Sequence, residues 1–210
     1  MRSKNIIFII ILLSSVFLST PANNIYADST TGETFNFRKS KWGYSKKRII
    51  TAEKSPLVKN EKKDDMEILV FSDRILELDC MIIYILINDK LVRSKYIITD
   101  KSLGIWDYLP SYLKFKEALN SKYGNPVKEE AKWKNPERYK RFGNPEKARN
   151  AIDDGYVAYL YSKWKTEGTD IVLYTDNEYN DPTPTQVEYI SVRLRDIEGS
   201  YNKKKVQSDL

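Results

Sequence analysis

Carboxylates are the side chains most able to do chemistry in this chain, because its 210 residues include one cysteine and no histidine. The missing histidine excludes Ser-His-Asp and Cys-His catalysis and imidazole-ligated zinc. Glu77 and Asp79 lie two residues apart in a segment with strand character, so we expect both on one face, with α-carbons about 7 Å apart. Such a pair could serve glycoside hydrolysis. It also fits the solvated side of an amphipathic strand, which we prefer, and we predict no catalytic residues.

A second group of oxygen-bearing side chains includes Asp176, Glu178 and Asp181, with two asparagines between them. Calcium takes about six to eight oxygen ligands, but the spacing and the central glycine of an EF-hand are absent. Asn and Asp also gather in ordinary turns. We therefore predict a turn and no metal site, with a weak calcium site as the open alternative. The scattered glycines form no phosphate-binding loop, and no cofactor is predicted.

The strongest binding signal is the segment 132–142, in which cations are interleaved with aromatic rings. The candidate partner-binding residues are Lys132, Trp133, Lys134, Arg138, Tyr139 and Arg141. This pattern suits anionic polymers, anionic lipid surfaces or an acidic protein, and rings with guanidinium groups are common interface hot spots. The alternative is a loop whose Trp133 and Phe142 pack into the core while the cations remain solvated.

Residues 1–27 have the pattern of a secretory signal peptide. Arg2 and Lys4 precede the apolar run 6–18, which rises only about 20 Å as a helix. A hydrocarbon core is ~30 Å thick, so we expect cleavage after Ala27 rather than a retained membrane anchor. Removal of its two cations lowers the net charge from +6 to +4. Cys80 is far from the cleavage point, so we expect no lipid anchor and a buried thiol.

Three segments carry helix signals. Ser45 is a predicted N-cap, followed by Ile49, Ile50 and Ala52 on the apolar side of a short helix that Ser55-Pro56 ends. The clearest helix spans 108–123, where apolar residues recur every three or four positions and Gly124 supplies the cap. Another short helix is predicted over 144–155.

The remaining apolar segments alternate as strands do. Predicted strands cover residues 68–71, 74–87, 91–99, 156–165, 170–175 and 186–194. Ser72-Asp73 and Asn88-Asp89 are predicted turns, and the charged segment 59–65 is predicted to be a solvated connection.

This order of elements predicts an α+β fold, with antiparallel β-meanders packed against helices. We expect two helix-plus-three-strand halves, at about 35–107 and 108–200, after a flexible leader at 28–34 and before a flexible tail at 201–210. The sequence leaves open whether the two halves share one sheet.

Several short motifs carry a resemblance to known proteins. They are the segment 37–45 with its Trp-Gly-Tyr-Ser, the hairpin 85–96, the helix end Lys-Tyr-Gly-Asn-Pro at 122–126, and the late strands 164–166 and 169–173. Together they resemble an uncharacterised family of small bacterial exported proteins with a Trp-Gly-x-Ser helix entry. The layout is similar to the BamE/SmpA-type outer-membrane assembly lipoproteins and, doubled, to the tandem β-lactamase inhibitor protein.

These relatives imply a binding module rather than an enzyme. The chain departs from them in lacking a lipobox cysteine and in placing Arg48 where the helix entry often carries an acid, so no contact residue is transferred. We expect an exported, periplasmic or secreted module that contacts protein or anionic polymer, with no nucleic-acid partner and no transmembrane segment after signal removal. The alternative function is a carboxylate-dependent hydrolase of cell-wall or glycan material.

Overall fold

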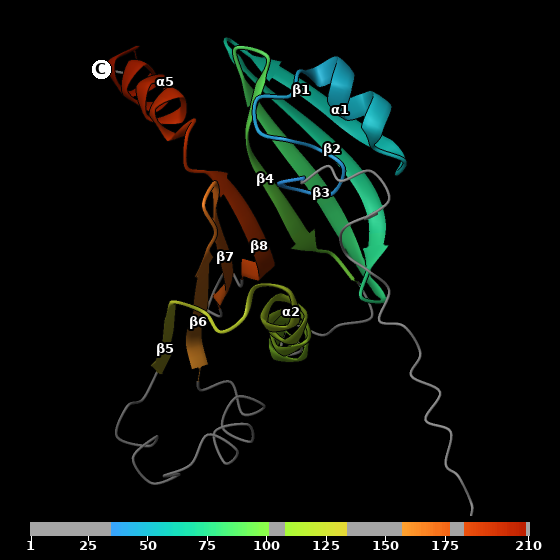
Figure 1. The fold of residues 1–210 in the computed structure, drawn as a ribbon, viewed down its shortest axis with the longest axis vertical. Coiled ribbons are helices and arrows are strands. Elements are labelled where there is room, and N and C mark those ends of the chain that lie inside the picture. Colours follow the sequence, from blue (N-terminus) through green and yellow to red (C-terminus); the bar gives the residue numbers. More distant parts are fainter. Residues whose placement is uncertain (1–34, 101–107, 134–156, 177–182, 209–210) are drawn as a thin grey trace, which may run out of the picture.

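A single antiparallel sheet dominates the computed structural model, which describes residues 35–100, 108–133, 157–176 and 183–208 (Figure 1). The strand order across the sheet is β1-β2-β3-β4-β8-β7-β6-β5. The strands are β1 (Leu57–Lys63), β2 (Met66–Ile75), β3 (Leu78–Ile87), β4 (Lys90–Ile98), β5 (Lys128–Trp133), β6 (Val157–Lys165), β7 (Thr169–Asp176) and β8 (Thr183–Ser191). The described helices are α1 (Lys46–Ala52), α2 (Tyr108–Tyr123) and α5 (Arg195–Ser208).

The predicted α+β fold of two helix-plus-three-strand halves is therefore wrong. The strands form two four-stranded meanders, β1 to β4 and β5 to β8, and their last strands pair with each other at the centre of one sheet. The two strands that were not predicted, β1 and β5, are the edges of this sheet. Charged side chains are favoured on edge strands, so neither strand shows the apolar alternation by which strands are predicted.

Strand β1 corrects the predicted solvated connection at 59–65. All seven of its residues are exposed, and it pairs with β2 from Leu57↔Phe71 to Lys63↔Met66. Backbone hydrogen bonds to β2 hold this strand, and they require no apolar side chain. High charge was therefore compatible with a strand here.

The turn predicted at Ser72-Asp73 is also displaced. Strand β2 continues through both residues, which pair with Met81 and Cys80 of β3. The chain reverses instead at Leu76 and Glu77, which both have positive φ, +51° and +64°. The predicted turn at Asn88 is confirmed: φ is +52° there and +55° at the next residue, as a two-residue hairpin turn requires.

Both predicted helices within the described residues form. The Ser45 hydroxyl caps α1 by accepting a hydrogen bond from the Arg48 amide at 3.5 Å, and Ile49 of this helix is fully buried. Ile50 was expected on the same apolar side but is 40% exposed, because one residue rotates a helix by about 100°. Gly124 follows α2 with φ +77°. The helix predicted at 144–155 lies outside the described residues.

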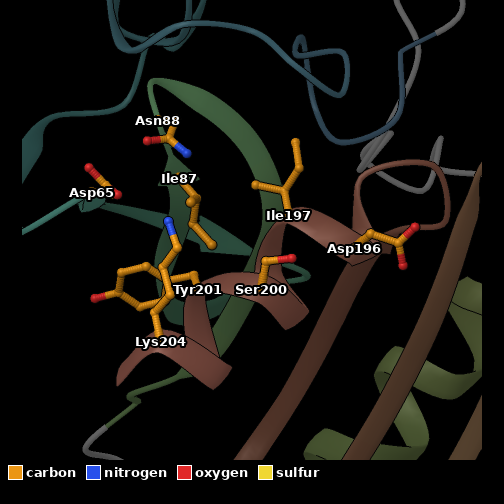
Figure 2. Close-up of a pocket in the computed structure, with 8 residues that line it drawn as sticks. All are labelled: Asp65, Ile87, Asn88, Asp196, Ile197, Ser200, Tyr201 and Lys204. Atoms are coloured by element: carbon orange, nitrogen blue, oxygen red, sulfur yellow. The ribbon is translucent and has the colours of Figure 1, made fainter. Parts of the chain in front are cut away.

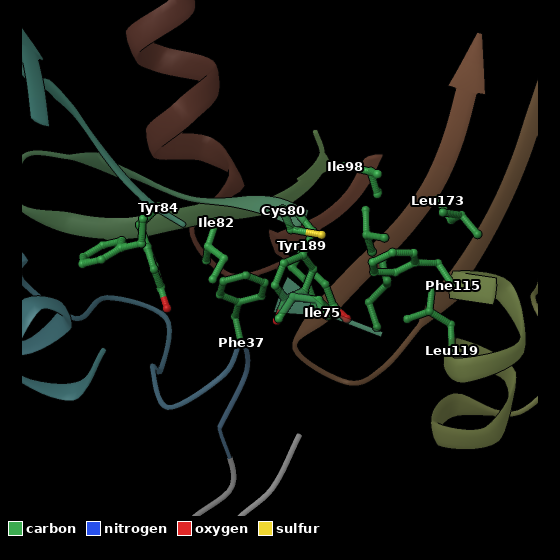
Figure 3. Close-up of a cluster of buried hydrophobic side chains, with 14 of the residues drawn as sticks. Phe37, Ile75, Cys80, Ile82, Tyr84, Ile98, Phe115, Leu119, Leu173 and Tyr189 are labelled. Atoms are coloured by element: carbon green, nitrogen blue, oxygen red, sulfur yellow. The ribbon is translucent and has the colours of Figure 1, made fainter. Parts of the chain in front are cut away.

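The main core lies between one face of the sheet and the segments that cover it, namely the chain before α1, α1 itself and α2. Phe37 enters from the first segment, Ile49 from α1, and Phe115 and Leu119 from α2. Figure 3 shows part of this cluster, with Cys80 among the apolar side chains. We refer to this covered side as the inner face, and to the opposite side as the outer face.

Helix α5 covers one end of the outer face. Its Tyr201 packs with Ile87 and Val92 in a smaller cluster, and Ile197 adds to it. The helix thus includes most of the segment that was expected to be a flexible tail. None of the helices among the described residues is both long and apolar enough to cross a membrane.

Candidate functional site

The predicted site residue Lys132 lies on the outer face of the sheet, at its β5 edge. Its Nζ is 5.6 Å from the centre of the Tyr159 ring, and Lys128 is placed in the same way, 5.7 Å from the Tyr161 ring. The register explains the arrangement, because Lys132 pairs with Tyr159 across β5 and β6, and alternate residues of a strand share a face. We call Lys128, Lys132, Tyr159, Tyr161 and Tyr174 the tyrosine–lysine face.

The tyrosines of this face lie on two neighbouring strands, β6 and β7. The Tyr159 and Tyr161 rings stack with centroids 6.0 Å apart, and Tyr174 on β7 pairs with Tyr161. The Tyr174 hydroxyl donates to Gln186 Oε1 at 3.0 Å and lies 3.4 Å from Glu188 Oε1. Burial, together with the Glu188 charge, raises the pKa of Tyr174 to about 12. The Tyr174 hydroxyl therefore stays neutral and able to donate at any physiological pH.

Ion pairs use most of the other charges near this face. Lys128 pairs with Glu130 at 2.5 Å, and Glu188 accepts from both Arg93 and Lys95 of β4. Lys132 forms no ion pair with any residue that the structure describes, and its side chain is exposed. No carboxylate of the described residues therefore has to be displaced before its ammonium group meets an acidic partner.

The other predicted partner-binding residues are only partly placed. Trp133 is the last residue of β5, while Lys134, Arg138, Tyr139 and Arg141 lie outside the described residues. The tyrosines of the face were not singled out from the sequence. Their alternation within a predicted strand did place Tyr159 and Tyr161 on one face, but the pairing of β5 with β6, which brings Lys132 to them, had no sequence signal.

Glu77 and Asp79 do not form the predicted same-face pair. Glu77 lies in the turn before β3, and Asp79 lies on β3. Both are exposed, and each pairs with a different cation: Glu77 with Lys114 at 3.1 Å, and Asp79 with Arg74 at 3.4 Å. The left-handed turn places Glu77 outside the strand alternation on which the prediction depended.

A buried carboxylate that was not predicted, Glu53, directly follows α1. Glu53 accepts from the Arg38 guanidinium at 2.8 Å and from the Tyr84 hydroxyl at 2.6 Å. Arg38 also reaches Asp73 at 2.9 Å, where the Ser55 hydroxyl donates at 2.8 Å. Burial alone would raise the pKa of Glu53, but Tyr84 and Arg38 lower it below its usual value. A carboxylate held ionised in this way is suited to fixing α1 on the sheet rather than to donating a proton.

The cysteine behaves as predicted, as a small buried residue. Cys80 is 2% exposed on the inner face, and burial raises the pKa of its thiol to about 12. Among the described residues, no three cysteine or carboxylate side chains gather as they would around a metal ion. The predicted oxygen-rich turn falls at 177–182, outside the described residues, apart from Asp176 at the end of β7.

A hollow of about 290 Å³ lies beside α5, where the helix meets two hairpin turns (Figure 2). Its rim carries both signs of charge, with Asp65 and Asp196 as acids and Lys204 as the cation. Tyr201 of the smaller core cluster also lines it. Lys132 and Trp133, the two predicted site residues that the structure describes, do not line this hollow.

No family model, no curated protein and no solved structure matches this chain.

Proposed function

We propose that this chain is an exported, non-catalytic binding module that contacts an acidic partner, a protein or an anionic polymer, through the tyrosine–lysine face. The observation that carries the proposal is the placement of Lys128 and Lys132 over two stacked tyrosine rings on the outer face of β5 and β6. The described helices pack elsewhere: α2 covers the inner face, and α5 lies over β3 and β4.

Rings and ammonium groups arranged in this way favour binding for two reasons. A tyrosine loses little conformational entropy on contact, because its ring has few rotatable bonds and is already packed on the strand. A lysine over a ring keeps its charge exposed while its stem covers apolar surface. An incoming carboxylate or phosphate can therefore pair with Lys132 while the neighbouring rings exclude water.

Export is the second part of the proposal, and it rests on the pattern of residues 1–27. Protein recovered from producing cells should begin at Asp28 when its N-terminus is sequenced. Recovery of the chain with Met1 or its leader intact would contradict this part while leaving the binding part open to its own test.

The binding part is tested with two anionic probes, poly-L-glutamate and long-chain polyphosphate, titrated calorimetrically at low salt. The double variant Lys128→Gln/Lys132→Gln should weaken binding about tenfold, which corresponds to about 1.4 kcal/mol for two exposed cation contacts. The matched control is Lys62→Gln/Lys63→Gln, which removes the same charge from exposed positions of β1 at the opposite edge of the sheet.

The two probes separate the two kinds of partner. Binding of poly-L-glutamate alone supports an acidic protein, and binding of polyphosphate alone supports a polymer. An equal loss of affinity in Lys128→Gln/Lys132→Gln and in the control Lys62→Gln/Lys63→Gln would indicate general attraction to a basic protein. That result would overturn the assignment of binding to the tyrosine–lysine face. Loss of all affinity at moderate salt in every variant would do the same.

A further inference from the structure

A second surface, unrelated to the tyrosine–lysine face, is a hollow of about 420 Å³ beside α1. Phe35 and Tyr44 supply its rings, and Lys39, Lys47 and Arg48 supply its charge. We call it the basic hollow. Within the described part of the chain, no acidic side chain lines it, in contrast to the mixed charges of the hollow beside α5.

The local fold explains why these residues meet. Gly43, with φ +82°, turns the chain before Ser45 starts α1, so Tyr44 stands one helical turn before Arg48. The Arg48 guanidinium lies over the Tyr44 ring, 4.2 Å from its centre. A guanidinium stacked on a ring keeps its N–H groups directed outward in its own plane, where they can donate to an anion.

The carboxylates around α1 are used elsewhere. Glu53, just after the helix, is turned inward, with a side chain only 3% exposed and bound by Arg38. Glu67 pairs with Lys46 at 2.5 Å, and Asp89 accepts from the Lys46 amide at 2.8 Å. Lys47 and Arg48 form no ion pair with any described residue. Their charges therefore face the hollow, and no carboxylate of the described residues pairs with either of them.

We propose that the basic hollow binds a small phosphate monoester, with the phosphate held by Arg48 and Lys47 and its organic ring lying against Phe35 and Tyr44. Two adjacent cations complement the two negative charges of a phosphate monoester better than they complement the single charge of a carboxylate. The planar guanidinium can also donate two parallel hydrogen bonds to phosphate oxygens. The aromatic walls give an attached ring an apolar surface to cover.

Phenyl phosphate is the probe, and amide chemical shifts of the full protein are the readout, with Thr51 and Ala52 as reporters in the hollow. Phenyl phosphate should bind more tightly than inorganic phosphate, and phenol should bind least. Arg48→Gln should weaken the binding of phenyl phosphate about tenfold. Arg48→Lys, which keeps the charge but loses the paired N–H donors, should have an affinity between those of the wild type and Arg48→Gln. Because Arg48 is exposed, neither variant should change the melting temperature.

Lys54→Gln is the matched control, since Lys54 is an exposed cation just after α1 that does not line the hollow. Equal weakening by Lys54→Gln and Arg48→Gln would overturn the proposal. Binding only to vesicles of phosphatidylglycerol, with none to phenyl phosphate, would also overturn it and indicate a membrane surface instead. The Lys128→Gln/Lys132→Gln variant should bind phenyl phosphate normally, so failure of the proposed function and failure of this site are distinguishable.

Discussion

At the scale of single residues, Glu53 shows what the buried charges of this protein do. Its carboxylate joins the end of α1 to Arg38 and to Tyr84 of β3, so three segments depend on one ionised group. The pKa of Asp73, the other carboxylate bound by Arg38, is also below its usual value: burial would raise it, but Ser55 and Arg38 lower it. Both acids therefore act as structural anions.

Glu53→Gln should destabilise the fold by about 3 kcal/mol near pH 7, because it leaves the Arg38 charge half-buried with one partner fewer. Since the folded pKa of Glu53 is lowered, its stabilisation is present above the unfolded value of about 4.3 and is lost as pH falls through the folded value. The difference between wild type and variant should therefore shrink below about pH 4. Urea unfolding across pH measures it.

Glu61→Gln is the comparison for that experiment. Glu61 pairs with Lys59 at 2.6 Å, but both side chains are more than half exposed. An exposed pair contributes about 0–1 kcal/mol, so this variant should differ little from wild type at any pH. If Glu53→Gln lowers the free energy of unfolding no more than Glu61→Gln does, the Glu53 carboxylate does not anchor α1.

At the scale of elements, the sequence predicts those that carry a strong local signal. Helix α2 has an apolar stripe and a glycine stop, and the Asn88 turn has residues that tolerate positive φ, so both were predictable. The edge strands β1 and β5 carry no such signal, because only backbone pairing with a neighbour makes them strands. The candidate site was not predicted for the same reason, because Lys132 reaches Tyr159 only when β5 pairs with β6.

Gly124, at the end of α2, and Gly199, inside α5, should change the stability of the protein in opposite directions when each is replaced by alanine. Gly124 ends α2 with φ +77°, and its carbonyl accepts from the Trp164 indole at 2.9 Å. Gly124→Ala should destabilise the protein by about 1 kcal/mol, because an alanine is strained at positive φ. Gly199→Ala, inside α5 with open space around it, should stabilise by up to about 1 kcal/mol.

Thermal unfolding should show a lower melting temperature for Gly124→Ala and a higher one for Gly199→Ala. A melting temperature that rises in both variants would show that the helix propensity of alanine outweighs the strain at Gly124. An unchanged melting temperature for Gly199→Ala alone would mean that α5 separates from the sheet before the rest unfolds.

At the scale of the whole molecule, the seam between the two meanders is the critical contact. Strands β4 and β8 pair from Arg93↔Ile190 to Ile97↔Gln186. Phe37 lies against this seam, with its ring 4.8 Å from that of Tyr96 on β4 and 5.0 Å from that of Tyr189 on β8. One side chain from the start of the described chain therefore contacts both meanders.

Phe37→Ala should cost about 3–5 kcal/mol, because the ring is 1% exposed and its loss leaves a cavity at the seam. Tryptophan fluorescence, which includes the buried Trp164 of the second meander, and far-ultraviolet circular dichroism should still give one coincident transition. Two separate transitions would show that the meanders are independent units. Leu113→Ala, at a 39% exposed position of α2, should change stability by only about 0.5 kcal/mol.

The order in which the strands follow one another has a consequence for biogenesis. As the chain emerges, β1 to β4 can assemble early, but the free edge of β4 must wait until β8, the last strand, arrives. Five of the nine residues of β4 are apolar or aromatic, whereas every residue of β1 is exposed. Polypeptides that end before residue 183 lack β8, so we expect the unpaired edge of β4 in such fragments to pair with other chains and to promote aggregation.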